Sequence, residues 1–198
     1  MLEFLAGTGL AVAAGLNAYI PLLALGLADR FTGLVQLPAD WSWLSNEWVL
    51  VILAILLLIE IIADKVPLVD SVNDWLQTVV RPASGGIVFG SGAASETVAV
   101  SDPAGFFAST QWPPIVLGAL IALGVHAAKM VARPALNAVT VGAAAPVVSS
   151  AEDAGSLMLA VFAILAPVLV ILAIAAGVLI MISVFRRIKR RKDAASPA

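Results

Sequence analysis

Long runs of apolar residues recur along this chain and constrain its fold more than any other feature. The clearest runs lie at about residues 4–28, 48–63, 113–132 and 155–185. Of the 198 residues, 61% are hydrophobic and 12% are charged, far from the balance of an average soluble domain. Inside a bilayer the backbone must satisfy its own hydrogen bonds, so such runs form helices. The sequence therefore predicts an all-α, polytopic helical membrane protein with four firm transmembrane helices.

Two further segments, residues 82–97 and 135–150, are short or broken candidates for crossing the membrane. Basic residues help to decide whether they cross, since Lys and Arg concentrate in cytoplasmic loops. If both segments cross, every basic residue except Arg30 lies on the cytoplasmic side; if neither crosses, Lys129 and Arg133 fall outside. We therefore expect about six crossings, with both termini inside.

The C-terminal tail is strongly basic. Six of the eleven basic residues stand between positions 186 and 192, directly after the last apolar run. This predicts a single transmembrane helical domain over residues 1–185 and a basic cytoplasmic tail over 186–198, in a multi-pass protein of the cell membrane. The chain has no cysteine, which excludes disulfides and thiol chemistry, and nothing in it indicates nucleic-acid binding.

Asn17 stands in the middle of the first apolar run, four residues before Pro21. Proline removes a backbone hydrogen bond from a helix, so this pattern predicts a kink at mid-membrane. The amide of Asn17 would either join neighbouring helices or contact a ligand.

Acidic side chains gather where the second apolar run ends. Glu60 and Asp64 are four residues apart and share a helix face, and Asp70 and Asp74 repeat that spacing after Pro67. Ionisable groups are costly within a membrane, so they indicate a functional site or a buried ion pair.

A polar stripe follows the third firm helix, where His126, Lys129, Arg133 and Asn137 recur at helical spacing. With six crossings, this stripe and the acidic pairs reach the same cytoplasmic side and are able to pair. His126 is the sole histidine and would either take up a proton near neutral pH or serve as a hydrogen-bonded core residue.

Arg81 and Arg133 are each followed directly by proline. We expect Pro82 and Pro134 to end the preceding helices, because the residue before a proline disfavours the helical conformation. The two arginines would then lie near helix ends, where long side chains commonly extend to the interface. The freed carbonyls would line a polar cavity or be capped by side chains.

A weak internal repeat is also suggested. Aligning Trp48 with Trp112 without gaps also pairs Lys65 with Lys129, each 64 residues apart. In the six-crossing topology these two helices run in the same direction, which would make a parallel repeat of the kind known in some transporters.

These observations lead to one hypothesis and one alternative. We expect a small transporter or channel-like protein with a polar intramembrane cluster, in which the acids attract a cation or proton, Lys129 and Arg133 balance charge, and Glu60 or His126 couples protons. The alternative is a non-transporting scaffold or lipid-binding protein whose charges are structural ion pairs. The candidate pathway or ligand-binding residues are Asn17, Glu60, Asp64, Lys65, Asp70, Asp74, Arg81, His126, Lys129, Arg133 and Asn137.

Other classes of function find less support in the sequence. A divalent cation at Glu60, Asp64, Asp70 and Asp74 would lack a His pair or a characteristic ligand spacing, so we predict no metal and no cofactor. No G-x-S-x-G or comparable signature is present, and we do not expect an enzyme. The expected partners are membrane lipids, a second copy of the chain, and a small ion or anionic lipid.

Three motifs together resemble a known family. They are Gly15-Leu-Asn-Ala-Tyr-Ile-Pro-Leu-Leu-Ala24 in the first run, Ala63-Asp-Lys-Val-Pro-Leu-Val-Asp-Ser71 with Asp74 and Arg81-Pro82 after the second, and His126-Ala-Ala-Lys129 with Arg133 and Asn137 in the third. On these residues the chain is similar to the family of small membrane proteins catalogued as domain of unknown function 4126. The resemblance implies an integral membrane protein with several helices, and it implies no substrate or activity.

Overall fold

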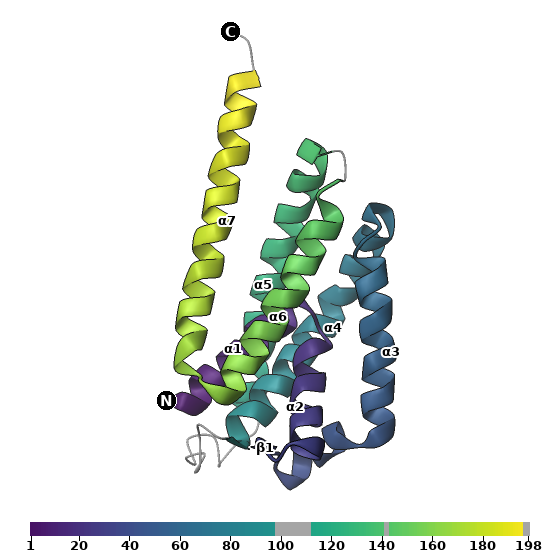
Figure 1. The fold of residues 1–198 in the computed structure, drawn as a ribbon, viewed down its shortest axis with the longest axis vertical. Helices are drawn as coiled ribbons and strands as arrows, with labels where there is room; N and C mark the ends of the chain where they lie inside the picture. The colour runs from purple at the N-terminus through teal and green to yellow at the C-terminus, as the bar shows by residue number, and fades with distance from the viewer. Residues whose placement is uncertain (98–111, 141–142, 196–198) are drawn as a thin grey trace.

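A computed structural model describes residues 1–97, 112–140 and 143–195, without the side chains of residues 67–68, 70–71, 139, 184–185 and 187–195. The fold is helical apart from one pair of two-residue strands, as the sequence predicts (Figure 1). The elements are α1 (Leu2–Leu16), α2 (Ile20–Phe31), β1 (Val35–Gln36), the 3-10 helix η1 (Ala39–Ser45), α3 (Glu47–Ala63), α4 (Pro67–Ala94), β2 (Glu96–Thr97), α5 (Trp112–Thr140), α6 (Ala145–Leu165) and α7 (Val168–Ala195).

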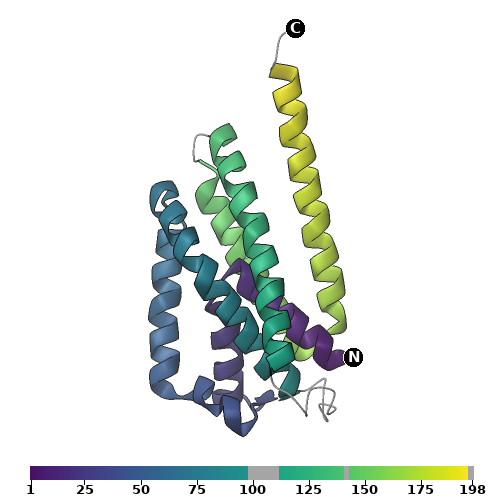
Figure 2. The ribbon, with the colours of Figure 1, turned by 180° about the vertical axis from the view of Figure 1, so that it is seen from behind.

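The first apolar run forms two helices instead of one kinked helix. α1 enters the bundle from the N-terminal end, the chain turns back at Asn17, and α2 returns toward the same end (Figures 1 and 2). Asn17 has an extended backbone, with φ −144° and ψ 124°, and Pro21 lies in the first turn of α2, where a missing N–H does no harm. The predicted kink is therefore a complete break.

The five later helices run alternately up and down the bundle, from α3 to α7 (Figures 1 and 2). Because α1 and α2 together return to their starting end, the N-terminus and the C-terminus lie at opposite ends of the bundle. This differs from the prediction that both termini share one side. The short antiparallel pair of β1 and β2, which joins Val35 to Thr97, ties two connections together at the N-terminal end.

Within the part of the chain that the structure describes, two helices are long and apolar enough to cross a membrane, namely α5 over Trp112–Ala138 and α6. The bent pair of η1 and α3, with an angle of 57° between them, makes a third candidate span, while α1 and residues 168–183 of α7 are apolar but shorter. The helices are thus of the membrane-spanning type, but the predicted count of about six crossings is not confirmed.

The two short segments of the prediction are not separate elements. Residues 82–97 belong mostly to α4, which continues through Pro82, and α5 likewise continues through Pro134 to Thr140. Helices tolerate an internal proline where neighbouring helices pack around the freed backbone groups. The final run is divided as well, because α6 ends at Leu165 and α7 begins at Val168.

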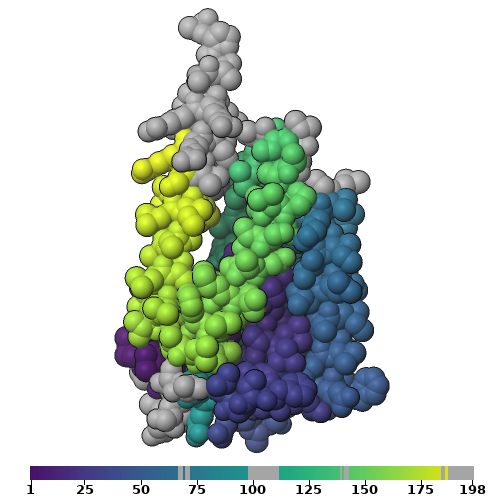
Figure 3. Space-filling model, in the orientation of Figure 1, coloured from purple at the N-terminus to yellow at the C-terminus, as the bar shows by residue number. Residues whose placement is uncertain are grey.

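Apolar side chains cover the outside of the bundle, whereas many polar ones are buried. Trp48, Trp75 and Val79 are each 75% exposed, and the exposed face of α3 is lined by isoleucine and leucine. Figure 3 shows this face, with α3, α6 and α7 exposed on it. α7 is anchored near its start by the fully buried Val170, and residues 175–183 are exposed. Such an arrangement suits a lipid surrounding.

Helices α4 and α5 approach each other closely through paired glycines. A Cβ atom added to Gly118 would meet the carbonyl oxygen of Gly85 and the side chain of Phe89. A Cβ atom added to Gly85 would in turn meet Ala122 and the backbone of Gly118. Small residues allow membrane helices to approach in this way, and here they hold α4 beside α5.

Replacing Gly118 with Ala should therefore separate the two helices. We expect Gly118→Ala to lower the free energy of unfolding by about 1–3 kcal/mol through overpacking. The matched control is Gly124→Ala on the same helix, since a Cβ atom there would meet nothing within 4 Å. Unfolding of both variants in detergent would be followed by circular dichroism. Equal stability of the two variants would contradict this packing.

The α1–α2 turn-back makes a topological prediction. A cysteine at the exposed Ser42 of η1 and an N-terminal tag should be accessible from one side of the membrane, and a cysteine at the exposed Ala143 from the other. The side of Ala143 should be that of the basic tail. Labelling of intact vesicles with a membrane-impermeant thiol reagent, together with protease access to the tag, would check this. A tag on the same side as Ala143 would restore an even number of crossings.

Candidate functional site

The break between α1 and α2 is formed by Asn17, Ala18 and Tyr19, and we refer to these three residues as the α1–α2 break. The relative exposures of the three are 0%, 0% and 9%, so the non-helical backbone is buried in protein. It lies part-way along the bundle, between α4 and α6 (Figures 1 and 2). Irregular backbone at such a depth is tolerated only where other protein groups or water satisfy its hydrogen bonds.

Asn17 satisfies the amide side of the break. Its side-chain Oδ1 accepts hydrogen bonds from the backbone N–H groups of Tyr19 at 3.0 Å and Ile20 at 3.2 Å. Its Nδ2 donates to Asp153 Oδ1 on α6 at 2.9 Å. Asn17 therefore caps the start of α2 and joins the break to α6, which is the helix-joining role considered from the sequence.

Side chains from α4 and α6 satisfy the carbonyl side. Ser156 donates to the carbonyl of Ala13 at 2.9 Å, and Ser84 donates to that of Ala18 at 2.5 Å. The guanidinium of Arg81 donates through Nη1 to the carbonyl of Gly15 at 3.0 Å. The carbonyl of Ala13 also accepts from the backbone N–H of Asn17 at 2.9 Å, whereas Arg81 and Ser84 supply the donors for the carbonyls of Gly15 and Ala18.

Arg81 also begins a network of buried charges. Its Nη2 lies 2.8 Å from Glu60 Oε1 on α3, and the two side chains are 0% and 1% exposed. The same Nη2 is 3.8 Å from Asp64 Oδ2. The expectation that Arg81 extends to the interface from a helix end is therefore wrong. Because α4 continues through Pro82, Arg81 stands near the middle of that helix, facing the break.

Asp64 is the acidic centre of the network. Its Oδ2 accepts from Lys129 Nζ at 3.1 Å and from Arg133 Nη2 at 3.2 Å, and its Oδ1 accepts from Asn73 Nδ2 at 2.9 Å. Asp64 is the C-cap of α3, so these bonds fix the end of α3 against α4 and α5. Three donors around one carboxylate make a strong site for negative charge.

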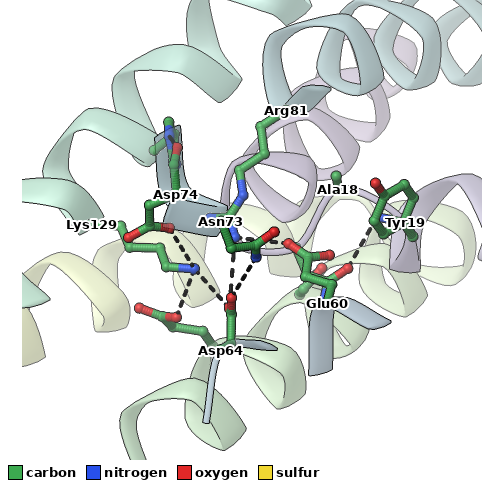
Figure 4. Close-up of polar contacts among 12 residues, drawn as sticks. Ala18, Tyr19, Glu60, Asp64, Asn73, Asp74, Arg81 and Lys129 are labelled. Atoms are coloured by element: carbon green, nitrogen blue, oxygen red, sulfur yellow. Dashed lines mark hydrogen bonds and ion pairs between the residues drawn. The ribbon is translucent and has the colours of Figure 1, made fainter. Parts of the chain in front are cut away.

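Lys129 and Arg133 join Asp64 to a carboxylate on α6. Lys129 Nζ lies 3.2 Å from Glu152 Oε2 and 3.6 Å from Asp74 Oδ1 (Figure 4). Arg133 donates to Glu152 twice, through Nη2 at 2.6 Å and through Nε at 3.4 Å. We call this network the charge cluster: Glu60, Asp64, Asp74, Arg81, Lys129, Arg133 and Glu152.

His126 lies beside the charge cluster. It is fully buried, and its Nε2 is 3.1 Å from the backbone carbonyl of Asp74 and 3.2 Å from Thr78 Oγ1. A carbonyl oxygen only accepts, so Nε2 carries a hydrogen. Nδ1 is buried without a hydrogen-bond partner among the described residues.

Most of the predicted site residues meet in one place. Six belong to the charge cluster, and Asn17 and His126 flank it. Lys65 does not join it, because its Nζ donates to the carbonyl of Ile61 at 3.2 Å, and the half-buried Asn137 also lies outside it. The side chain of Asp70 lies outside the described residues.

Glu152 and Asp153 were missed by the sequence analysis. It divided the chain between residues 150 and 155, which left both acids in a connection. The structure places both of them inside α6. Two adjacent acids in a 21-residue helix that is otherwise uncharged were the signal that could have identified them. Ser84 and Ser156 gave no comparable signal, since serine is common in membrane helices.

The carboxylates of the cluster face cations of the protein. Among the described residues, no three His, Asp or Glu side chains form a group that could hold a metal ion. The cluster holds paired buried charges beside the α1–α2 break.

The fold and this site together define a small, all-helical protein of the membrane-spanning type that is organised around buried ion pairs. It belongs to the family described as Domain of unknown function (DUF4126), which it matches over residues 4–187. The resemblance seen in the three sequence motifs is thereby confirmed. No match was found among curated proteins or among solved structures.

The ion pairs predict that neutralising a buried carboxylate destabilises the fold far more than neutralising an exposed one. We expect Asp64→Asn to lower the free energy of unfolding by about 3–5 kcal/mol, because it leaves Lys129 and Arg133 buried beside a neutral group. The control Glu47→Gln removes an exposed carboxylate 3.5 Å from Arg30 and should change stability by about 0–1 kcal/mol. Denaturant titration in micelles would measure both. A similar small loss in both variants would refute a structural role for the network.

Proposed function

We propose that the protein is a small transporter or channel-like protein of the cell membrane, and that the charge cluster forms part of its ion pathway. The observation that carries this proposal is the α1–α2 break, a buried interruption between two helices. Its backbone carbonyls accept hydrogen bonds from Arg81 of the charge cluster and from two neighbouring serines. In many transporters, discontinuous helices form the substrate or ion site near the middle of the membrane.

The electrostatics of the break favour an ion site. The last carbonyls of α1 and the first amides of α2 meet there, which places the negative end of one helix dipole beside the positive end of another. Arg81 balances the carbonyl end and Asn17 the amide end. A small change in charge near Arg81 would therefore alter the balance at the break.

The buried charges occupy one half of the bundle. The cluster extends from the break toward the end where α3 meets α4. Toward the opposite end, the core contains the buried apolar side chains of Leu25, Val88 and Phe89. Such an arrangement corresponds to a pathway that is closed by an apolar layer, and opening it would require the helix pair α1–α2 to move.

The orientation follows from the basic residues. With the C-terminal tail in the cytoplasm, the charge cluster would open toward the cytoplasmic side. Membrane lipids would cover the exposed apolar faces. Because so few helices enclose little volume, a second copy of the chain would help to build the pathway.

The alternative function is a scaffold or lipid-binding protein in which the cluster is a structural lock. The two hydrogen bonds from Arg133 to Glu152 and the three donors around Asp64 favour it, since such bonds fix helix register. A lock, however, would leave the break permanently inaccessible to water, and this distinguishes the two functions.

Accessibility of the break tests the proposed function. Ala18 and Ala160 are both 0% exposed, but Ala18 lies in the break and Ala160 in the apolar core of α6. If the pathway opens, a small impermeant thiol reagent should label Ala18→Cys from one side of a vesicle and leave Ala160→Cys unlabelled. Because the chain has no native cysteine, the background is low.

A flux measurement completes this test. Purified protein in liposomes should carry at least one small inorganic ion or proton across the membrane, measured with ion-sensitive dyes against protein-free liposomes. Protection of Ala18→Cys in folded protein together with the absence of any flux would refute transport and favour the structural lock.

A further inference from the structure

The formal charges of the described members of the charge cluster do not cancel. Its carboxylates are Glu60, Asp64, Asp74 and Glu152, and its cations are Arg81, Lys129 and Arg133. Four acids against three bases leave one negative charge in excess when all are ionised. An uncompensated charge is unfavourable in a buried site and is commonly removed by binding a proton. The question is which carboxylate would take it.

Asp64 and Glu152 are the members best held as anions. Asp64 accepts from two cations and from Asn73, and Glu152 faces both Lys129 and Arg133. Glu60 has one close cation, Arg81, and that guanidinium is shared with the carbonyl of Gly15. Asp74 has Lys129 at 3.6 Å, and its Oδ1 is buried without a hydrogen-bond partner among the described residues, but its side chain is 8% exposed against 1% for Glu60. Glu60 is therefore the more deeply buried of the two incompletely compensated carboxylates.

One oxygen of Glu60 has no hydrogen-bond partner among the described residues. Oε1 accepts from Arg81, whereas Oε2 is buried and unpaired. Gln77, on the α4 turn before Arg81, is 3% exposed and likewise has a buried, unpaired acceptor, Oε1. Arg81 Nε is a buried donor that also lacks a partner among the described residues, so the place for an additional hydrogen is indicated by Oε2 of Glu60 together with the excess negative charge.

A proton suits this site better than a metal cation. A hydrated metal ion would need several oxygen ligands around it, and the guanidinium of Arg81 already occupies one side of Glu60 at 2.8 Å. The charged and titratable groups that surround Glu60 are Arg81 from α4, Lys129 from α5, Tyr19 before α2 and Asp64 on its own helix. A proton needs a single lone pair, and Oε2 provides one.

We propose that Glu60 carries an exchangeable proton, so that the proton is the ion handled at the inner end of the charge cluster. The proton site itself is independent of the proposed function, and only the movement of the proton across the membrane rests on that function. In the step, one O–H bond of hydronium on the solvent side breaks and leaves a water molecule, and an O–H bond forms at Oε2 of Glu60. The described cluster then holds three anions and three cations.

The cluster provides a graded connection from solvent to Glu60. The side chain of Glu152 is 15% exposed and that of Asp74 is 8% exposed, whereas Asp64 is 3% and Glu60 1% exposed. Lys129 contacts three of these carboxylates. Chains of acidic groups of this kind relay protons in membrane proteins. Protonation of Glu60 would also weaken its ion pair with Arg81. This would in turn loosen the hydrogen bond that Arg81 donates to the carbonyl of Gly15 at the break.

Infrared difference spectroscopy of the purified full-length protein tests the site without reference to transport. At neutral pH the wild type should show the C=O stretch of a protonated carboxylic acid, and this band should shift on exchange into D2O. Glu60→Gln, which keeps the shape of the neutral acid, should lose the band and retain the folded yield. Glu47→Gln, the same change at the exposed start of α3, should keep it.

If Glu60→Gln does not fold, Glu60→Asp becomes the deciding variant. Its carboxylic acid band should appear at a frequency different from that of the wild type. The absence of an acid band in the wild type, or a band that neither Glu60 variant alters, would overturn the proposal.

Proton flux in liposomes separates this proposal from the proposed function. With a pH-sensitive dye inside, the wild type and Glu47→Gln should dissipate an imposed pH gradient, and Glu60→Gln should do so no faster than protein-free liposomes. An acid band assigned to Glu60 without any flux would keep the proton site and refute transport. Flux that persists in Glu60→Gln would refute the role of Glu60 in it.

Discussion

The structure depends on how a buried interruption of the backbone is satisfied. Residues 17–19 leave helical geometry inside an apolar bundle, where unpaired peptide groups are severely unfavourable. Asn17 supplies the acceptor for the amides, while Arg81, Ser84 and Ser156 supply donors for the carbonyls. The position of α4 and α6 beside the break follows from these bonds as much as from apolar packing.

This requirement also explains the charge cluster. Arg81 is needed as a donor at mid-bundle, and a buried guanidinium needs an anion, which Glu60 provides. Asp64 is then one helical turn beyond Glu60, and its own cations come from the stripe on α5. Each buried charge thus needs a partner of opposite sign, and the series of pairs ends at Glu152, whose side chain is 15% exposed. The same chain of pairs is compatible with a structural lock and with a relay, and the two differ in whether the break opens.

Much of this could be predicted from residues whose types are rare in apolar helices. Asn17 marked the break, and the spacing of His126, Lys129 and Arg133 marked one polar face, because a helix repeats every 3.6 residues. What failed depended on tertiary context. Pro82 and Pro134 were expected to end helices, yet neighbouring helices stabilise the continuous α4 and α5. The turn-back of α1–α2 was not predicted, because the donors that permit it lie 66 to 143 residues away along the chain.

That separation has a consequence for how the protein is made. The peptide groups at residues 13–20 leave the ribosome well before Ser84 and Arg81, and earlier still than Asp153 and Ser156. During synthesis the carbonyls of Gly15 and Ala18 therefore lack their donors until α4 has been made, and before then the α1–α2 pair cannot settle at its final depth in lipid. Insertion of this pair must wait at a wet interface or within the insertion machinery, so the pair is made before its partners and reaches its place together with them or after them.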